Sequence, residues 1–144
     1  MNVEFSGIER RLDELSERLA RLAPLKNRPL TDFRADPYLR DIVERNLEVA
    51  AQCCLDVCHR IIAIEGALKP RDYRDAILRV GELGVVPVEF AEKLAPLAGF
   101  RNILIHEYLE VDWDEVYSNL ADIDDLARFA AFVRAWLSEH AGPG

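Results

Sequence analysis

Long apolar runs are missing from the sequence. The longest of them, such as residues 61–64, fall far below the ~18 to 20 residues that span a lipid bilayer. The first seven residues also lack the basic stretch and the apolar stretch of a secretory signal. These absences predict a protein without a membrane span or membrane association, and we expect it to be cytoplasmic.

Basic residues are in short supply. The chain has 18 Lys and Arg against 26 Asp and Glu, a formal net charge of −8, which argues against a protein that coats nucleic acid nonspecifically. The imbalance is uneven, because residues 107–144 hold nine acids and two bases, whereas residues 1–106 are nearly balanced. A locally positive cleft therefore remains possible around Lys69, Arg71, Arg74, Arg79 and Arg101.

The few cysteines do not form a disulfide framework. Cys53, Cys54 and Cys58 crowd into six positions of one expected helix, unlike the spaced, even-numbered cysteines of small secreted domains. Cys54, Cys58 and His59 share part of a zinc-ligand pattern, but the other two histidines are isolated and no second ligand pair completes it. We therefore expect buried apolar thiols, no metal and no cofactor.

Alternating strand patterns are absent, and apolar residues recur at helical spacing instead. The Asp36-Pro37 pair is a typical helix start, and Asp112 and Glu115 have the spacing of a capping box. The expected helices cover residues 8–22, 37–65, 72–83, 87–95, a segment from 96 past the His106 region, and 113–137. This pattern predicts an all-α, antiparallel bundle of about five to six helices, as one domain over 1–140 with a frayed C-terminus at 141–144.

Polar side chains with catalytic potential cluster after Pro96. Arg101, Asn102, His106 and Tyr108 fall on the surface of a helix whose core stripe contains Leu97, Phe100 and Leu104. At 100° per residue, Arg101 and Tyr108 lie about 20° apart around the axis, whereas Arg101 and His106 lie about 140° apart. One helix does not bring the Arg and His together easily, so two copies packed about a two-fold axis would form a composite site.

The string Arg101-Asn102-x-x-x-His106-x-Tyr108 resembles the Arg-x4-His-x-Tyr motif of the HepT toxins, a family of HEPN-domain ribonucleases. The similarity extends over most of the chain. It includes the segment 58–63, the helix at 73–76, the turn at 84–87, the lead into the motif at 97–100 and the segment 111–113 that follows it. The resemblance implies a HEPN-type helical bundle.

The resemblance also implies a function. The chain would be the toxin of a type VII-like HEPN/MNT toxin–antitoxin pair, a homodimeric, metal-independent endoribonuclease. It would cleave RNA, often tRNA, in the cleft between protomers. Arg101 would bind phosphate and stabilise the transition state, His106 would transfer protons, and Asn102 would orient the substrate or the imidazole. The antitoxin, an MntA-like minimal nucleotidyltransferase, would AMPylate Tyr108 and so neutralise the toxin.

Other interpretations remain open from the residues alone. The chain could be a noncatalytic HEPN-like helical dimer that binds a nucleotidyltransferase partner or a nucleotide. Arg71 and Arg74 could be ordinary surface charges or guides for RNA. Asp56 and Arg60 have the spacing of an ion pair within one helix, although that helix could also line the cleft.

Overall fold

The protein is all-helical in every part that the computed structural model describes, namely residues 3–106, 112–120 and 122–141. Within these ranges the chain forms eight α-helices and one short 3-10 helix, Ala23–Leu25, with no β-strand. The α-helices are α1 (Val3–Leu22), α2 (Leu30–Ala35), α3 (Pro37–Ile64), α4 (Tyr73–Glu82), α5 (Val88–Leu94), α6 (Leu97–His106), α7 (Trp113–Leu120) and α8 (Ile123–Ala141). The expectation of an all-α bundle is confirmed.

The central element is α3, which begins as the sequence predicts. The carboxylate of Asp36 accepts hydrogen bonds from the backbone N–H groups of Tyr38 and Leu39, and Pro37 occupies the first turn. The helix has 28 residues, so it is roughly 42 Å long at 1.5 Å per residue. It ends before Gly66, whose φ of 68° suits a residue without a Cβ.

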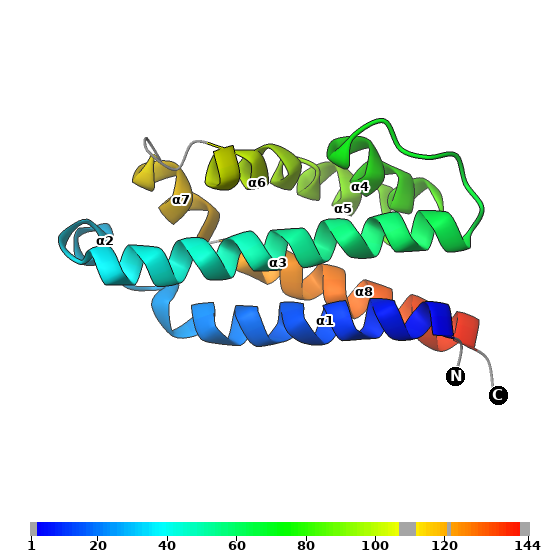
Figure 1. Ribbon diagram of the computed structural model, residues 1–144, viewed down its shortest axis with the longest axis horizontal. Coiled ribbons are helices and arrows are strands. Elements are labelled where there is room, and N and C mark those ends of the chain that lie inside the picture. Colours follow the sequence, from blue (N-terminus) through cyan, green and yellow to red (C-terminus); the bar gives the residue numbers. More distant parts are fainter. Residues whose placement is uncertain (1–2, 107–111, 121, 142–144) are drawn as a thin grey trace.

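One layer of helices lies on each side of α3 (Figure 1). On one side α1 runs antiparallel to α3, and α8 packs along α1. On the other side lie α4 and α6, with α5 packed against α4. One face of α3 therefore contributes to the main core, while α6 is held against α3 from the opposite layer.

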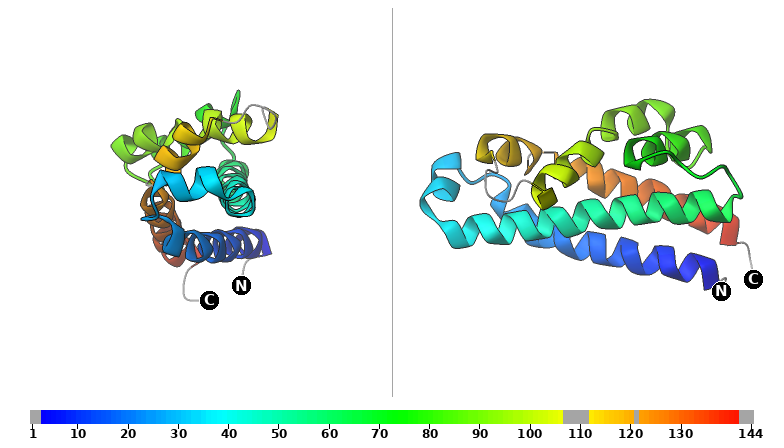
Figure 2. Two further views of the ribbon diagram at one scale, coloured as in Figure 1. Left: turned by 90° about the vertical axis from the view of Figure 1, so that its left-hand side faces the viewer. Right: turned by 45° about the horizontal axis from the view of Figure 1, so that its top comes forward.

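A second, smaller core closes the end of the bundle where α3 begins. Phe33 of α2 is fully buried, its ring stacked 5.9 Å from that of Trp113 and tilted 5.5 Å from that of Tyr117, both on α7. Figure 2 shows α7 lying beside α2 at this end. Phe100 of α6 belongs to the same cluster, so this small core also anchors the helix that carries the motif.

The C-terminal part differs from the sequence-based prediction. A single helix was expected over residues 113–137, but the chain forms α7 and α8, and the N–H of Asp125 bonds to the carbonyl of Asp122 where the second helix starts. Val116, Leu120 and Ile123 are all buried in the small core, so the apolar spacing continues through the break and conceals it. The six-residue α2 was also not predicted, because it is too short to show a period.

Three further expectations concern the cysteines, the membrane and the C-terminus. The three thiols are free and buried, as predicted. None of the described helices is long and apolar enough to cross a membrane. Helix α8 ends at Ala141, and most of the segment expected to fray, residues 142–144, lies outside the described residues.

Candidate functional site

The motif helix α6 is positioned by its first turn. The N–H groups of Gly99 and Phe100 donate to the carbonyl of Pro96 at 3.1 and 3.2 Å, and Phe100 is buried. Arg101 follows directly, half-buried at the surface between α3 and α4. The burial of Phe100 thus fixes the azimuth of the helix and, with it, the direction in which Arg101 leaves the backbone.

The structure describes the side chain of only one of the four motif residues, Arg101. Asn102 and His106 lie on α6, with side chains outside the described part of the structure, and Tyr108 lies outside the described residues altogether. Of the four expected site residues, the structure therefore places only the Arg101 side chain. The proposed roles of the other three stay predictions.

Arg101 is held by residues from two other helices. Its Nε donates a hydrogen bond of 2.8 Å to Oε1 of Gln52 on α3. Its guanidinium carbon lies 5.1 Å from the ring centroid of Tyr73, the first residue of α4, in a cation–π arrangement. Sequence reasoning missed both partners. The available signal for Gln52 was its place one helical turn before Asp56, on the same face of α3.

A chain of polar contacts continues behind Gln52. The amide nitrogen of Gln52 donates to Oδ1 of Asp56 at 2.8 Å, and Oδ2 of Asp56 lies 3.6 Å from Nε of Arg11 on α1. Nη1 of Arg11 also donates to the carbonyl of Gly7 at 3.0 Å. Because Asp56 accepts from the amide, the Gln52 oxygen is turned toward Arg101, and three helices cooperate to orient one guanidinium.

The ion pair expected between Asp56 and Arg60 is replaced by the contact with Arg11. Arg60 instead lies over Gly7 of α1, where an added Cβ would stand 2.7 Å from its Nη1. The spacing within α3 was correct for a pair, but a competing cation on α1 approaches Asp56 and the missing side chain of Gly7 accommodates Arg60. Sequence separation within one helix could not reveal either neighbour.

Tyr73 is fixed on more than one side. Its ring meets the ring of His59 edge-on, with centroids 5.5 Å apart and an interplanar angle of 86°. Nε2 of His59 is buried and has no hydrogen-bond partner within the described residues. Tyr73 is therefore held between the cation of Arg101 and the imidazole of His59, and it links the motif helix to the α3–α4 connection.

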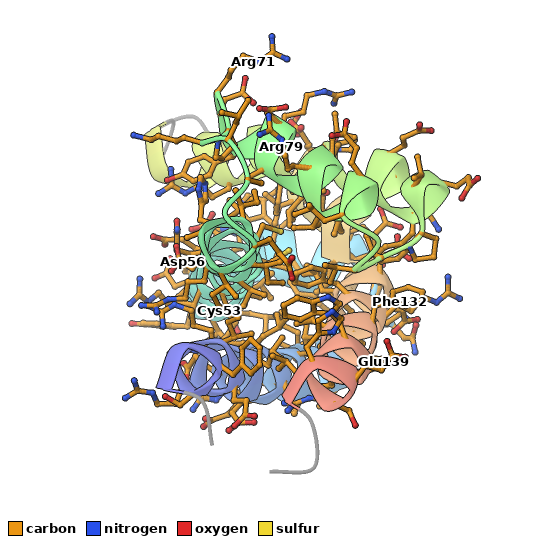
Figure 3. All side chains as sticks on the ribbon, turned by 90° about the vertical axis from the view of Figure 1, so that its right-hand side faces the viewer. Cys53, Asp56, Arg71, Arg79, Phe132 and Glu139 are labelled. Carbon is orange, nitrogen blue, oxygen red and sulfur yellow. The ribbon has the colours of Figure 1, made fainter. Side chains whose placement is uncertain are left out.

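Two open hollows flank Tyr73. One, of about 510 Å³, is lined by residues of α3 and of the α3–α4 connection, including His59, Lys69 and Arg71. The other, of about 360 Å³, lies between α4 and α6, and Arg74 and Gly99 line it. Asp72 and Tyr73 belong to both. Figure 3 shows Arg71 projecting from the upper end of the molecule, on the same side as Arg79 and beyond Asp56.

Arg79, one of the cations grouped with Arg71 and Arg74 in the sequence, has a different environment. It donates to the carbonyl of Leu68 and to Oδ2 of Asp75, the latter at 3.0 Å. The pKa of Asp75 lies below its ordinary value because the backbone N–H of Arg71 donates to this carboxylate and Arg79 lies beside it. Arg79 therefore holds the α3–α4 connection against α4.

Comparison with known proteins places the chain in a family of ribonucleases. The model of the family described as "Ribonuclease HepT-like" matches residues 8–133. A protein named "tRNA nuclease HepT" from Aphanizomenon flos-aquae is 29% identical over 116 residues, which cover 81% of this chain and 79% of that protein. A protein named "mRNA nuclease HepT" from Shewanella oneidensis is 24% identical over 106 residues, covering 73% and 80% respectively.

The fold is shared with solved structures. A tri-AMPylated HEPN toxin of Shewanella oneidensis, solved in complex with an MNT antitoxin, superposes with a TM-score of 0.79 at 22% identity. The match covers 94% of this chain and 99% of that chain. At this level of identity the likeness concerns the fold, and it agrees with the HEPN-type helical bundle that the motif implied.

Proposed function

Because the chain belongs to the HepT-like ribonuclease family, we propose that it is the toxin of a type VII-like HEPN/MNT toxin–antitoxin pair. It acts in the cytoplasm as a metal-independent endoribonuclease on RNA, with tRNA as one candidate substrate. The observation that carries this proposal is the placement of Arg101, a motif cation held by Gln52 and by the ring of Tyr73 at the surface between three helices.

RNA supplies its own nucleophile, which limits what the protein must provide. A base removes the proton of the 2′-hydroxyl, the 2′-oxygen attacks phosphorus, and the bond from phosphorus to the 5′-oxygen breaks. The products are a 2′,3′-cyclic phosphate and a 5′-hydroxyl, whose oxygen takes up a proton. His106 carries out the proton transfers, since imidazole titrates near neutrality. Asn102 orients the substrate or the imidazole.

Arg101 stabilises the charge that develops on the phosphate oxygens. A guanidinium is always protonated and matches the planar arrangement of two phosphate oxygens. Preorganisation matters for this role, because a charge that is already oriented needs no rearrangement when the transition state forms. The hydrogen bond to Gln52 and the contact with Tyr73 supply such orientation.

The site is completed by a second copy of the chain. Arg101 and His106 are separated by about 140° around α6 if the helix is regular. Two motif helices related by a two-fold axis would place the Arg and His of both copies around one cleft. We therefore propose a homodimer as the active form.

Neutralisation occurs at Tyr108. The phenolic oxygen attacks the α-phosphorus of ATP on an MntA-like minimal nucleotidyltransferase, pyrophosphate leaves, and the phenolic proton passes to a base. The attached AMP is a bulky anion, and continuation of the helical period would place it near the azimuth of Arg101. It would occupy the phosphate position and repel RNA.

The test compares single substitutions in the full chain. Purified wild-type protein, Arg101→Ala and His106→Ala are incubated with tRNA and with mRNA in the presence of EDTA, and the new RNA ends are mapped. We expect wild-type cleavage and a loss of at least about 100-fold in each variant, as for removal of an acid–base or transition-state group. Arg134→Ala, an exposed arginine on α8 that pairs with Asp13 of α1, is the control.

Cleavage that persists in both motif variants would overturn the site, and a wild-type protein that cuts no RNA would favour the noncatalytic helical dimer. Incubation with the partner nucleotidyltransferase and ATP tests the modification. We expect a mass increase that maps to Tyr108 and the loss of RNA cleavage. A modification mapping elsewhere would refute this assignment.

A further inference from the structure

Three cations surround the two hollows beside Tyr73. Lys69 and Arg71 line the hollow next to His59, and Arg74 lines the hollow next to α6. All three side chains are exposed, that of Arg71 at 87%. This positive group stands out in a chain whose formal net charge is −8.

Little in the described structure engages these charges. Across residues 3–106, 112–120 and 122–141, neither Lys69 nor Arg74 forms an ion pair, and Arg71 lies at a long 3.8 Å from Asp75. Arg79 provides the contrast, because its side chain is only 20% exposed and bonds to both Leu68 and Asp75. Four cations close together in the sequence thus divide into one that holds the connection and three that face solvent.

The acids at the same surface are already engaged. Asp56 accepts a hydrogen bond from the Gln52 amide and lies beside Arg11. Asp72 caps α4 by accepting from the N–H of Asp75 at 2.7 Å. Among the charged residues that line the two hollows, three are cations, Lys69, Arg71 and Arg74, and two are acids, Asp56 and Asp72, so the lining carries an excess of positive charge.

Both hollows adjoin the candidate site at Tyr73. This ring forms part of both walls and lies against the guanidinium of Arg101. On the α6 side, Gly99 adds no side chain, and a Cβ there would meet nothing within 4 Å. A polyanion that places one phosphate at Arg101 would find an open path with cations on both sides of Tyr73.

We propose that Lys69, Arg71 and Arg74 form a binding track for the phosphate backbone of a single-stranded RNA segment, with Tyr73 between its two halves. This inference rests on the proposed ribonuclease function and adds where the strand runs next to the scissile phosphate. RNA is favoured over an acidic protein because the cations lie on both sides of the Tyr73 ring, which contacts the motif residue Arg101, and all three come from the short stretch 69–74. The track also explains how an acidic protein binds a polyanion, since contact is confined to one strip.

The test measures RNA binding by the full chain carrying His106→Ala, so that the strand stays intact. The probe is a fluorescein-labelled single-stranded RNA of mixed sequence, titrated by anisotropy at several salt concentrations. One variant adds Lys69→Ala, Arg71→Ala and Arg74→Ala. Its matched control adds Arg10→Ala, Arg21→Ala and Arg134→Ala, which remove the same charge from exposed sites on α1 and α8.

We expect the track variant to bind about 100-fold more weakly at 0.1 M salt, with a slope of log K against log salt that is smaller by about 2. The RNA affinity of the control should fall by less than about 5-fold, which is roughly the effect of losing one phosphate contact. Arg71→Lys should restore part of the affinity lost in Arg71→Ala, because a backbone contact needs charge rather than a particular geometry.

Equal losses in the track variant and the control would overturn the track, since net charge alone would then explain binding. An unchanged RNA affinity with a weakened complex with the nucleotidyltransferase would also overturn it and would assign the strip to that partner. A chain that binds no RNA strand would overturn it as well. Cleavage by the wild-type chain is scored separately, so the ribonuclease proposal can stand while the track fails.

Discussion

Gln52 and Arg101 are joined by a hydrogen bond of 2.8 Å although they lie 49 residues apart in the chain. Gln52 in turn is tied to Asp56, and Asp56 to Arg11, so the orientation of the motif guanidinium depends on α1 and α3 as well as on α6. Gln52 touches no substrate in the proposed reaction. It is a positioning residue, and its effect should appear in the rate of the chemical step.

Gln52→Ala should lower kcat by about 10-fold to 100-fold, because a hydrogen bond to a charged group contributes about 1.5–3 kcal/mol. Single-turnover cleavage separates this step from RNA binding, which should change little. Gln52→Glu keeps an acceptor for Arg101 but adds a negative charge near the phosphate, so it should raise KM. Glu48→Ala, one turn earlier on α3, is the control, and an equal fall in its kcat would contradict a specific role for Gln52.

Tyr73→Ala should reduce cleavage by about 2-fold to 30-fold, since a cation–π contact is worth about 0.5–2 kcal/mol. Tyr73→Phe keeps the ring beside Arg101 and His59 and should retain most of the activity. The measurement is kcat/KM on one defined RNA for the wild type and both variants. A loss in Tyr73→Phe as large as that in Tyr73→Ala would show that the hydroxyl, rather than the ring, matters.

The thiols should be inert in the folded protein. Burial raises the pKa of Cys53 to about 11, and the pKa of Cys54 lies well above its ordinary value for the same reason. At pH 8 a chromogenic aromatic disulfide should label none of the three cysteines in the native state and all three in guanidinium chloride. Rapid labelling of the native chain would contradict this.

The raised pKa of Cys53 also has a consequence for stability. The unfolded chain loses the thiol proton near pH 9, whereas the folded chain keeps it until about pH 11. The contribution of the Cys53 thiol to the free energy of unfolding is therefore complete below pH 9 and is lost as the pH rises from 9 to about 11. Urea unfolding should show that the free energy of unfolding falls less between pH 8 and pH 10.5 in Cys53→Ala than in the wild type.

The small core should couple α2 to α7. Phe33 is fully buried between Trp113 and Tyr117, so Phe33→Ala should lower the free energy of unfolding by about 3–5 kcal/mol. Trp113 fluorescence should shift to longer wavelength as its environment becomes more polar. Arg34→Ala, which removes only the exposed ion pair between α2 and Asp114 of α7, should change stability by less than about 1 kcal/mol. An equal loss of unfolding free energy in the two variants would show that the burial of Phe33 is not what couples α2 to α7.

Local signals in the sequence were sufficient for the main framework. The start of α3 is encoded by Asp36 and Pro37, and Gly66 and Gly84 adopt the positive φ values that turns between helices require. The motif helix was found from its apolar stripe and from the polar residues beside it. Each of these features depends on residues within a few positions of one another.

The remaining features depend on contacts that sequence spacing does not contain. The break between α7 and α8 is hidden because residues on both sides point into one core. Gln52 and Tyr73 approach Arg101 from other helices, and Arg11 rather than Arg60 meets Asp56. Such neighbours become visible only when helices distant in sequence are packed together.

The contact between Gly7 and Arg60 constrains how these two positions can vary. Glycine within a helix costs roughly 0.5–1 kcal/mol relative to alanine, so its presence in α1 needs a reason, and the guanidinium in the place of a side chain supplies one. Because that guanidinium ends a flexible chain, a larger residue at 7 could be accepted if Arg60 swings away. Among homologous sequences we therefore expect correlated substitution, with a small residue on α1 accompanying a long cation on α3.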